Sequence, residues 1–151
     1  MTMSVASIDE LETKVGDPLG TSDYMEITQD QVNEFADATG DHQWIHVDVE
    51  RAKAGPFGGP IAHGFLTLSL APALVGGLLQ VGGISMGVNY GLNKVRFPSP
   101  VPVGSKVRAS GVLKEYSKIT GGAQVVLEAT FEVEGSTKPS CVAELVFRYY
   151  V

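Results

Sequence analysis

The sequence is poor in cysteine and has no cluster of basic residues. Cys141 is the only cysteine among 151 residues, which excludes an internal disulfide and a zinc site built from several cysteines. Acidic residues outnumber basic ones by 17 to 11, and the formal net charge is −6. Because binding to a phosphate backbone needs clustered Lys and Arg, the sequence argues against a nucleic-acid partner.

A secretory signal and a convincing membrane span are also missing. The first residues, MTMSVASIDELETKVG, include Asp9 and Glu10 and have neither a basic start nor an apolar stretch behind it. Residues 62–81 are apolar and long enough to span a bilayer, but they contain Pro72 and Gly76 and lack flanking Lys or Arg clusters. We therefore expect a cytoplasmic protein with no membrane span, in which this run is a buried helix.

What is present is the composition of an ordinary globular domain. Hydrophobic residues make up 44% of the chain and charged residues 19%, which excludes disorder as the main state. A length of 151 residues suits one hydrophobic core, so residues 1–151 are expected to form a single domain.

Helical signals lie in the N-terminal half. Thr28 is a suitable N-cap and Gly40 a suitable C-terminal stop, which predicts a helix between them. A short helix is predicted over residues 48–55. A long apolar helix is predicted over residues 63–79, bent near Pro72 because proline disrupts the helical hydrogen bonds.

The C-terminal half changes to the alternating pattern of half-buried strands. Apolar and polar residues alternate over residues 125–133 and 141–150, and strands are also predicted over 84–97 and 106–116. Antiparallel strands after one apolar helix predict an α+β fold in which a curved sheet wraps around the helix. Because one small sheet covers only part of such a helix, we expect a second subunit to cover the rest.

The densest group of polar side chains is residues 41–46, DHQWIH, directly after the first predicted helix. Asp41 and His46 can converge on one water, which the carboxylate orients or deprotonates while the imidazole transfers the proton near neutral pH. Spacing alone leaves two alternatives open. Asp41 could cap the following turn, or the histidines could bind a metal with Asp41, although Trp44 favours a buried turn and no HExxH pattern is present.

A second candidate is the entry of the apolar helix at residues 59–64, GPIAHG. Free N–H groups at a helix N-terminus beside Gly64 can hold a developing oxyanion. Gly64 could equally be required for packing at the helix start. His63, taken by itself, is expected to have a structural role, in which it satisfies nearby main-chain groups. Lys94 and Arg96 share one face of a predicted strand, where they either form a solvated surface or contact a ligand.

These residues together resemble the MaoC-like, (R)-specific enoyl-CoA hydratases. The family motif runs Asp, any residue, Asn, Pro, any residue, His. Asp41 and His46 keep its two chemical groups, whereas Gln43 and Trp44 replace Asn and Pro. The Gln-Trp variant is similar to the nodulation-protein-N-like branch of the family.

Further segments extend the resemblance over residues 29–149. Residues 60–64, PIAHG, are similar to the family's helix entry, and residues 95–98 and 101–104 to the strand and turn that follow. The resemblance implies the hot-dog fold, in which a curved antiparallel sheet surrounds a long central helix. It also implies a homodimer.

The activity that the resemblance implies is the hydration of a trans-2-enoyl-CoA to a (3R)-3-hydroxyacyl-CoA, or the reverse dehydration. Asp41 and His46 would hold the water that adds to C3, and the Gly64 N–H would bind the thioester carbonyl oxygen. No metal or redox cofactor is implied, because coenzyme A enters as part of the substrate. The resemblance also implies substrate contacts from Ile61, Ala62, His63, Gly64, Asn89, Tyr90 and Arg96.

Two other functions fit the same fold. An acyl-CoA thioesterase would direct its carboxylate at the thioester carbonyl and release a free thiol. A non-catalytic, acyl-thioester-binding subunit of a heterodimeric dehydratase would bind substrate without converting it. Such subunits usually lack the Asp/His pair, which this chain retains at Asp41 and His46.

Overall fold

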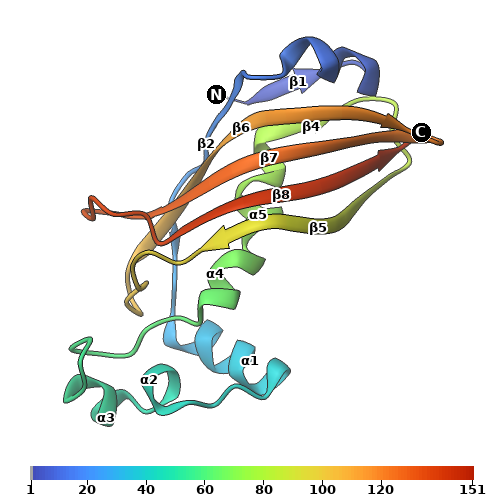
Figure 1. Ribbon diagram of the computed structural model, residues 1–151. Coiled ribbons are helices and arrows are strands. Elements are labelled where there is room, and N and C mark those ends of the chain that lie inside the picture. The colour runs from blue at the N-terminus through green and yellow to red at the C-terminus, as the bar shows by residue number, and fades with distance from the viewer. Residues whose placement is uncertain (1) are drawn as a thin grey trace.

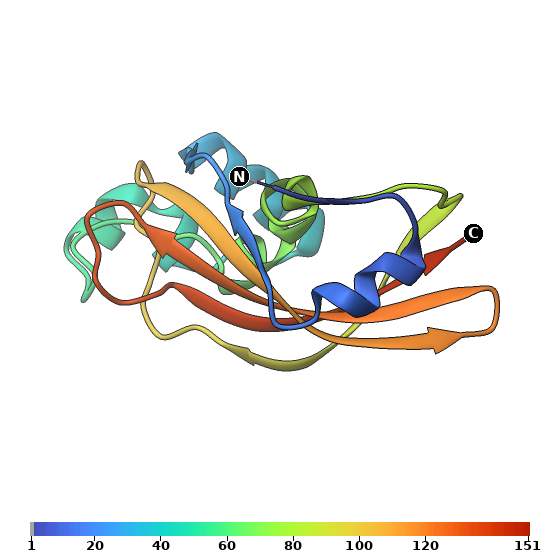
Figure 2. The ribbon, with the colours of Figure 1, turned by 90° about the horizontal axis from the view of Figure 1, so that it is seen from above.

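A strongly curved antiparallel sheet with helices against its concave face dominates the computed structural model, which describes residues 2–151 (Figure 1 and Figure 2). The long strands form one layer, and a helical segment runs across it (Figure 1). Three further helices lie beyond one end of the sheet (Figure 1). This arrangement confirms the α+β hot-dog architecture expected from the sequence.

The main sheet has the strand order β2-β6-β7-β8-β5, and the two-residue strand β3 also pairs with β6. Its strands are β2 (Pro18–Thr21), β3 (Met25–Glu26), β5 (Met86–Arg96), β6 (Lys106–Ile119), β7 (Gly122–Val133) and β8 (Cys141–Tyr150). β5 lies at one edge and pairs only with β8 among the described residues. The four strands predicted from alternation are therefore confirmed, with a slightly longer β6.

Alternation along β7 and β8 places one face of each strand in the core. Val125, Leu127 and Phe131 of β7 are each exposed by 1% or less. Cys141 begins β8 on the same face and is fully buried, and burial raises the pKa of its thiol to about 11. The inner face of the sheet and the helical segment thus form one hydrophobic core.

The apolar run that enters the core is not one long helix. It forms α4 (Gly64–Ser69), α5 (Ala71–Leu74) and a 3-10 turn, η2 (Gly76–Leu78). Pro72 lies in the first turn of α5, where its missing N–H is tolerated, so the proline begins a new helix instead of bending a continuous one. The run is interrupted next to Pro72, where the sequence predicted a bend, and the predicted continuous helix is wrong.

The same run is not covered on all sides. Phe65 on α4 is 72% exposed, so within one chain the sheet covers only part of the run, as the sequence analysis expected. No helix within residues 2–151 has the length and apolar character needed to cross a membrane.

The helices beyond the sheet are α1 (Gln29–Thr39), α2 (Trp44–Val47) and α3 (Val49–Lys53). Thr28 accepts a hydrogen bond from the Gln31 N–H at 3.1 Å, and Gly40 ends α1 in the left-handed conformation with φ 84°, as predicted. α3 confirms the short helix expected there. α2 was not predicted, because its four residues are too few to show a helical period.

The N-terminal segment contributes elements that the sequence analysis missed. β1 (Met3–Val5) pairs in parallel with β4 (Leu79–Val81), and a 3-10 helix, η1 (Ile8–Lys14), follows β1. Leu11 of η1 is fully buried in the core. The pairing of β1 with β4 therefore places the start of the chain beside the end of the helical segment.

Candidate active site

Two main-chain hydrogen bonds fix the segment that leads into α4. The Ile61 N–H donates to the Ile45 carbonyl of α2 at 3.0 Å. The Ala62 N–H donates to the Val101 carbonyl at 2.8 Å. The segment is thereby held between α2 and the 101–103 turn, and it delivers His63 and the start of α4 next to the loop after α1.

His46, on α2, is buried with 6% of its surface exposed. Its Nδ1 lies 2.7 Å from the Ile61 carbonyl oxygen. Because a carbonyl can only accept, Nδ1 carries the proton and Nε2 of the neutral ring is left as an acceptor. The His46 main-chain carbonyl accepts a hydrogen bond from Gln29 Nε2 at 2.8 Å. Both the ring and the main chain of His46 are therefore fixed.

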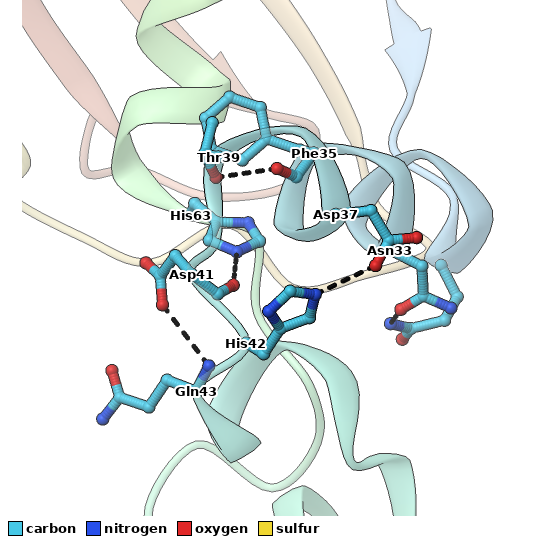
Figure 3. Close-up of polar contacts among 9 residues, drawn as sticks. Asn33, Phe35, Asp37, Thr39, Asp41, His42, Gln43 and His63 are labelled. Atoms are coloured by element: carbon cyan, nitrogen blue, oxygen red, sulfur yellow. Dashed lines mark hydrogen bonds and ion pairs between the residues drawn. The ribbon is translucent and has the colours of Figure 1, made fainter.

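His63 is the residue just before α4, and it is 2% exposed. Its Nε2 donates to the main-chain carbonyl of Asp41 at 3.0 Å (Figure 3). Its ring stacks on His46 with centroids 3.9 Å apart and packs against Phe35 at 4.8 Å. His63 Nδ1 is buried with no hydrogen-bond partner among the described residues.

Asp41 lies on the exposed loop between α1 and α2. A carboxylate oxygen of Asp41 and one ring nitrogen from each of His46 and His63 all lie within 4.8 Å of one another. Two hydrogen bonds of about 2.8 Å through one water span up to about 5.6 Å. The predicted convergence of Asp41 and His46 on a single water is thus sterically possible.

The remaining histidine of the loop does not join this group. His42 Nε2 lies 2.9 Å from the Asp37 carboxylate on α1, and both side chains are exposed. Figure 3 shows His42 directed towards Asp37, whereas His63 is directed at the main chain of Asp41.

The geometry of the two stacked rings does not suit a shared metal ion. A histidine nitrogen binds an ion in the plane of its ring, at about 2.0–2.1 Å for zinc. The planes of His46 and His63 are only 25° apart at a centroid distance of 3.9 Å. No single position lies in both ring planes and also within about 2.1 Å of a nitrogen of each ring. The lone pairs of the two rings therefore do not point at a common ion.

The start of α4 lies between two cavities. A cavity of about 480 Å³ is lined by Asp41, His46, His63 and Gly64, among others. A second cavity, of about 280 Å³, shares His46, Gly64 and Phe97 with the first. A Cβ atom on Gly64 would lie 3.3 Å from the Phe97 ring, so glycine lets the first turn of α4 pack closely against this ring.

Ile61 and Ala62 line the smaller of these cavities, as the predicted substrate contacts require. Asn89 lines a neighbouring cavity of about 340 Å³ with Phe65 and Pro72. The first cavity contains Phe65 as well, so Asn89 lies along the helical segment that leads away from Asp41.

Tyr90 and Arg96 lie on the face of the sheet that is turned away from the core. Tyr90 stacks under the Arg148 guanidinium at 3.5 Å, on the face of β8 opposite the core. Arg96 is paired in register with Val142 and shares an outer-face cavity with Lys114. The sheet separates both side chains from Asp41 and His46 within one chain, and their substrate contacts stay predictions.

The Gln-Trp pair that departs from the family motif begins α2. Trp44 is its first residue, and the Arg51 guanidinium lies 4.4 Å from the centre of the Trp44 ring. Gly55 passes so close to this ring that a Cβ atom would lie 2.9 Å from it. Trp44 is therefore packed but only half-buried, where the sequence predicted a buried turn, and Gln43 is exposed.

The sequence analysis missed two residues of this site, Gln29 and Phe97. Gln29 is the first residue of α1, where a glutamine is indistinguishable from an ordinary helix former. Phe97 follows β5 and looked like the end of a strand. Its link to the site is its contact with Gly64, which is 33 positions earlier in the chain. That contact exists only in the folded structure, so no local sequence pattern shows it.

Comparisons with known proteins agree with one another. A family model described as a MaoC like domain matches residues 10–136. The chain is 56% identical over 144 residues to 3-hydroxyacyl-thioester dehydratase Z of Mycobacterium tuberculosis, covering 95% of each chain. It is 43% identical over 148 residues to nodulation protein N of Rhizobium leguminosarum, covering 95% of this chain and 91% of that one.

A solved structure shows the same fold. The unliganded R-hydratase PhaJ1 of Pseudomonas aeruginosa superposes with a TM-score of 0.75 at 23% identity, covering 95% of this chain and 86% of that one.

The two hydrogen bonds to main-chain carbonyls predict opposite tautomers for the stacked histidines. When both imidazole rings are uncharged, His46 should carry its proton on Nδ1 and His63 should carry its proton on Nε2. Two-bond ¹⁵N–¹H correlation spectra of the imidazole rings above pH 8 distinguish the two forms, and His42 serves as the exposed reference. An Nε2-protonated His46 would contradict the geometry described above.

Proposed function

The chain belongs to the MaoC-like domain family, and on that basis we propose that it catalyses the reversible hydration of a trans-2-enoyl-CoA to a (3R)-3-hydroxyacyl-CoA. The observation that carries this proposal is the meeting of Asp41 and His46 within 4.8 Å at a cavity that also includes Gly64. The name of the relative in Mycobacterium tuberculosis, a 3-hydroxyacyl-thioester dehydratase, supports the same reaction class.

In the proposed reaction, Asp41 and His46 hold one water between them. The water oxygen forms a bond to C3 of the enoyl group while one water proton passes to the pair. A proton is delivered to C2, so that the elements of one water are added across the double bond. His46 suits the accepting role because its Nδ1 proton is committed to the Ile61 carbonyl, which leaves Nε2 free.

Gly64 has a separate role in this proposal. As C3 is attacked, negative charge develops on the thioester carbonyl oxygen. The N–H groups in the first turn of a helix have no partner within the helix, and the Gly64 N–H would donate to that oxygen. The missing side chain of Gly64 lets Phe97 pack against the start of α4, beside the proposed position of the thioester.

We propose that the reaction needs no metal and no redox cofactor. The stacked rings of His46 and His63 do not share a coordination point, which supports this view. Coenzyme A would take part only as the carrier of the acyl group. Residues 1–151 would act as one hot-dog domain.

We also propose that two copies of the chain pair through the β5 edge. β5 has strand partners on one side only among the described residues, and an open edge can pair with another strand. Beside it, large apolar side chains are exposed: Met86 by 52%, Leu92 by 45% and Phe65 by 72%. Because an apolar patch of this kind marks an interface, a second copy would cover both the edge and α4.

Replacing Asp41 by Asn is expected to lower kcat for crotonyl-CoA hydration by about 10²–10⁴-fold, because a positioned acid or base contributes that much. Asp37→Asn is the matched control, since Asp37 is an exposed carboxylate that contacts His42 instead. The loss of absorbance of the enoyl thioester measures the rate, and a thiol reagent detects any free coenzyme A.

Three outcomes of this assay would contradict the proposal. Asp41→Asn could retain more than about a tenth of the wild-type rate, which is outside the range expected for the loss of a positioned acid or base. Free thiol could appear in step with the absorbance change, which would assign a thioesterase. Dialysis against a chelator could abolish the wild-type rate and zinc restore it, which would assign a metal enzyme.

Sedimentation equilibrium is expected to give twice the chain mass of 16.0 kDa for the wild type. Leu92→Glu should shift the mass towards the monomer, because it places a charge in the proposed interface. Val15→Glu is the control, as Val15 is also 44% exposed but lies at the end of η1. A wild type that sediments as a monomer, or a Leu92→Glu variant as dimeric as the control, would contradict the pairing.

A further inference from the structure

We propose that Gln29 and His63 are positioning residues that set the distance between Asp41 and His46 by holding the main-chain carbonyl of each. His63 donates to the Asp41 carbonyl at 3.0 Å, and Gln29 donates to the His46 carbonyl at 2.8 Å. This inference rests on the proposed function, because it assumes that Asp41 and His46 together hold the reacting water.

The hydrogen bond from His63 restrains a loop that otherwise has little support. Asp41 is exposed, and its carboxylate accepts only a long hydrogen bond of 3.3 Å from the Gln43 N–H. His63 is buried and adjoins Gly64, the first residue of α4. The contact between His63 and Asp41 therefore links the carboxylate to the helix start that would bind the thioester oxygen.

The hydrogen bond from Gln29 restrains the other residue of the pair. Gln29 begins α1, and its amide nitrogen reaches both the His46 carbonyl and the Asn33 side chain. α1 ends at Thr39, two residues before Asp41, so Gln29 and Asp41 lie at opposite ends of the same helix. If α1 shifted, the distance between Asp41 and His46 would change. The hydrogen bonds from Gln29 and His63 oppose such a shift.

Both residues keep a buried polar atom without a partner. His63 Nδ1 and Gln29 Oε1 are two of the three buried side-chain polar atoms that lack a hydrogen bond among the described residues. Leaving a buried acceptor unpaired is unfavourable for folding. Each residue thus holds a carbonyl of the pair with one polar atom and loses stability through the other, which points to a purpose in addition to stability.

The test separates loss of activity from loss of stability. His63→Phe keeps an aromatic ring for the stack on His46 but removes the donor and the unpaired nitrogen. Gln29→Met keeps the length of the side chain but removes its donor and its unpaired oxygen. In each, kcat for crotonyl-CoA should fall about 10- to 100-fold, since a misplacement of about 1 Å costs up to about 10²-fold. KM should stay within about twofold. The melting temperature should stay within a few degrees of the wild-type value, because each change removes an unpaired buried atom as well as a hydrogen bond to a carbonyl.

Matched controls complete the experiment. His63→Gln can still donate to the Asp41 carbonyl and should recover most of kcat. His42→Phe on the same loop and Gln31→Met on the same helix should keep the wild-type kcat, because neither side chain contacts Asp41 or His46.

The outcomes distinguish this inference from the proposed function. A wild type with no hydratase activity refutes the proposed function. If the wild type is active, the inference is overturned when both His63→Phe and Gln29→Met keep more than half of kcat. It is also overturned when kcat and melting temperature fall together in both variants, or when His63→Gln is as impaired as His63→Phe.

Discussion

The hydrogen bond from His46 Nδ1 to the Ile61 carbonyl is the contact on which the rest of the site depends. It fixes the tautomer of the imidazole, and it joins α2 to the segment that leads into α4. The same segment is held on its other side by the Val101 carbonyl. Hydrogen bonds thereby join the His46 ring, the start of α4 and the turn at Val101, and in the proposed reaction this connection would supply the preorganisation that catalysis requires.

The two members of the pair are supported in different ways. His46 is buried, with its ring stacked on His63 and its nitrogen committed to a carbonyl. Asp41 is exposed and borders the larger cavity. Such an arrangement keeps one partner fixed while the other remains open to water, so that a solvent molecule can enter and be held between them.

The sequence predicted the parts of this structure that depend on local patterns. Thr28, Gly40 and the alternation in β7 and β8 are local signals, and each is confirmed. The continuous helix over residues 63–79 was wrong because Pro72 starts α5 instead of bending one helix. The contact from Gln29 to the His46 carbonyl joins residues 17 positions apart in the chain, and no local pattern reports it.

The position of Tyr90 and Arg96 on the outer face of the sheet has a simple geometric cause. Successive side chains of a strand point to opposite faces, so Asn89 and Tyr90 could not both line one cavity. The irregular pairing of β5 between Asn89 and Gly91 shows how the register shifts at this point.

The most direct test of the central claim is to convert crotonyl-CoA in H₂¹⁸O and analyse the product. The account predicts ¹⁸O on C3 of an R-configured 3-hydroxyacyl-CoA. An S configuration, or ¹⁸O in a free carboxylate released with coenzyme A, would contradict it.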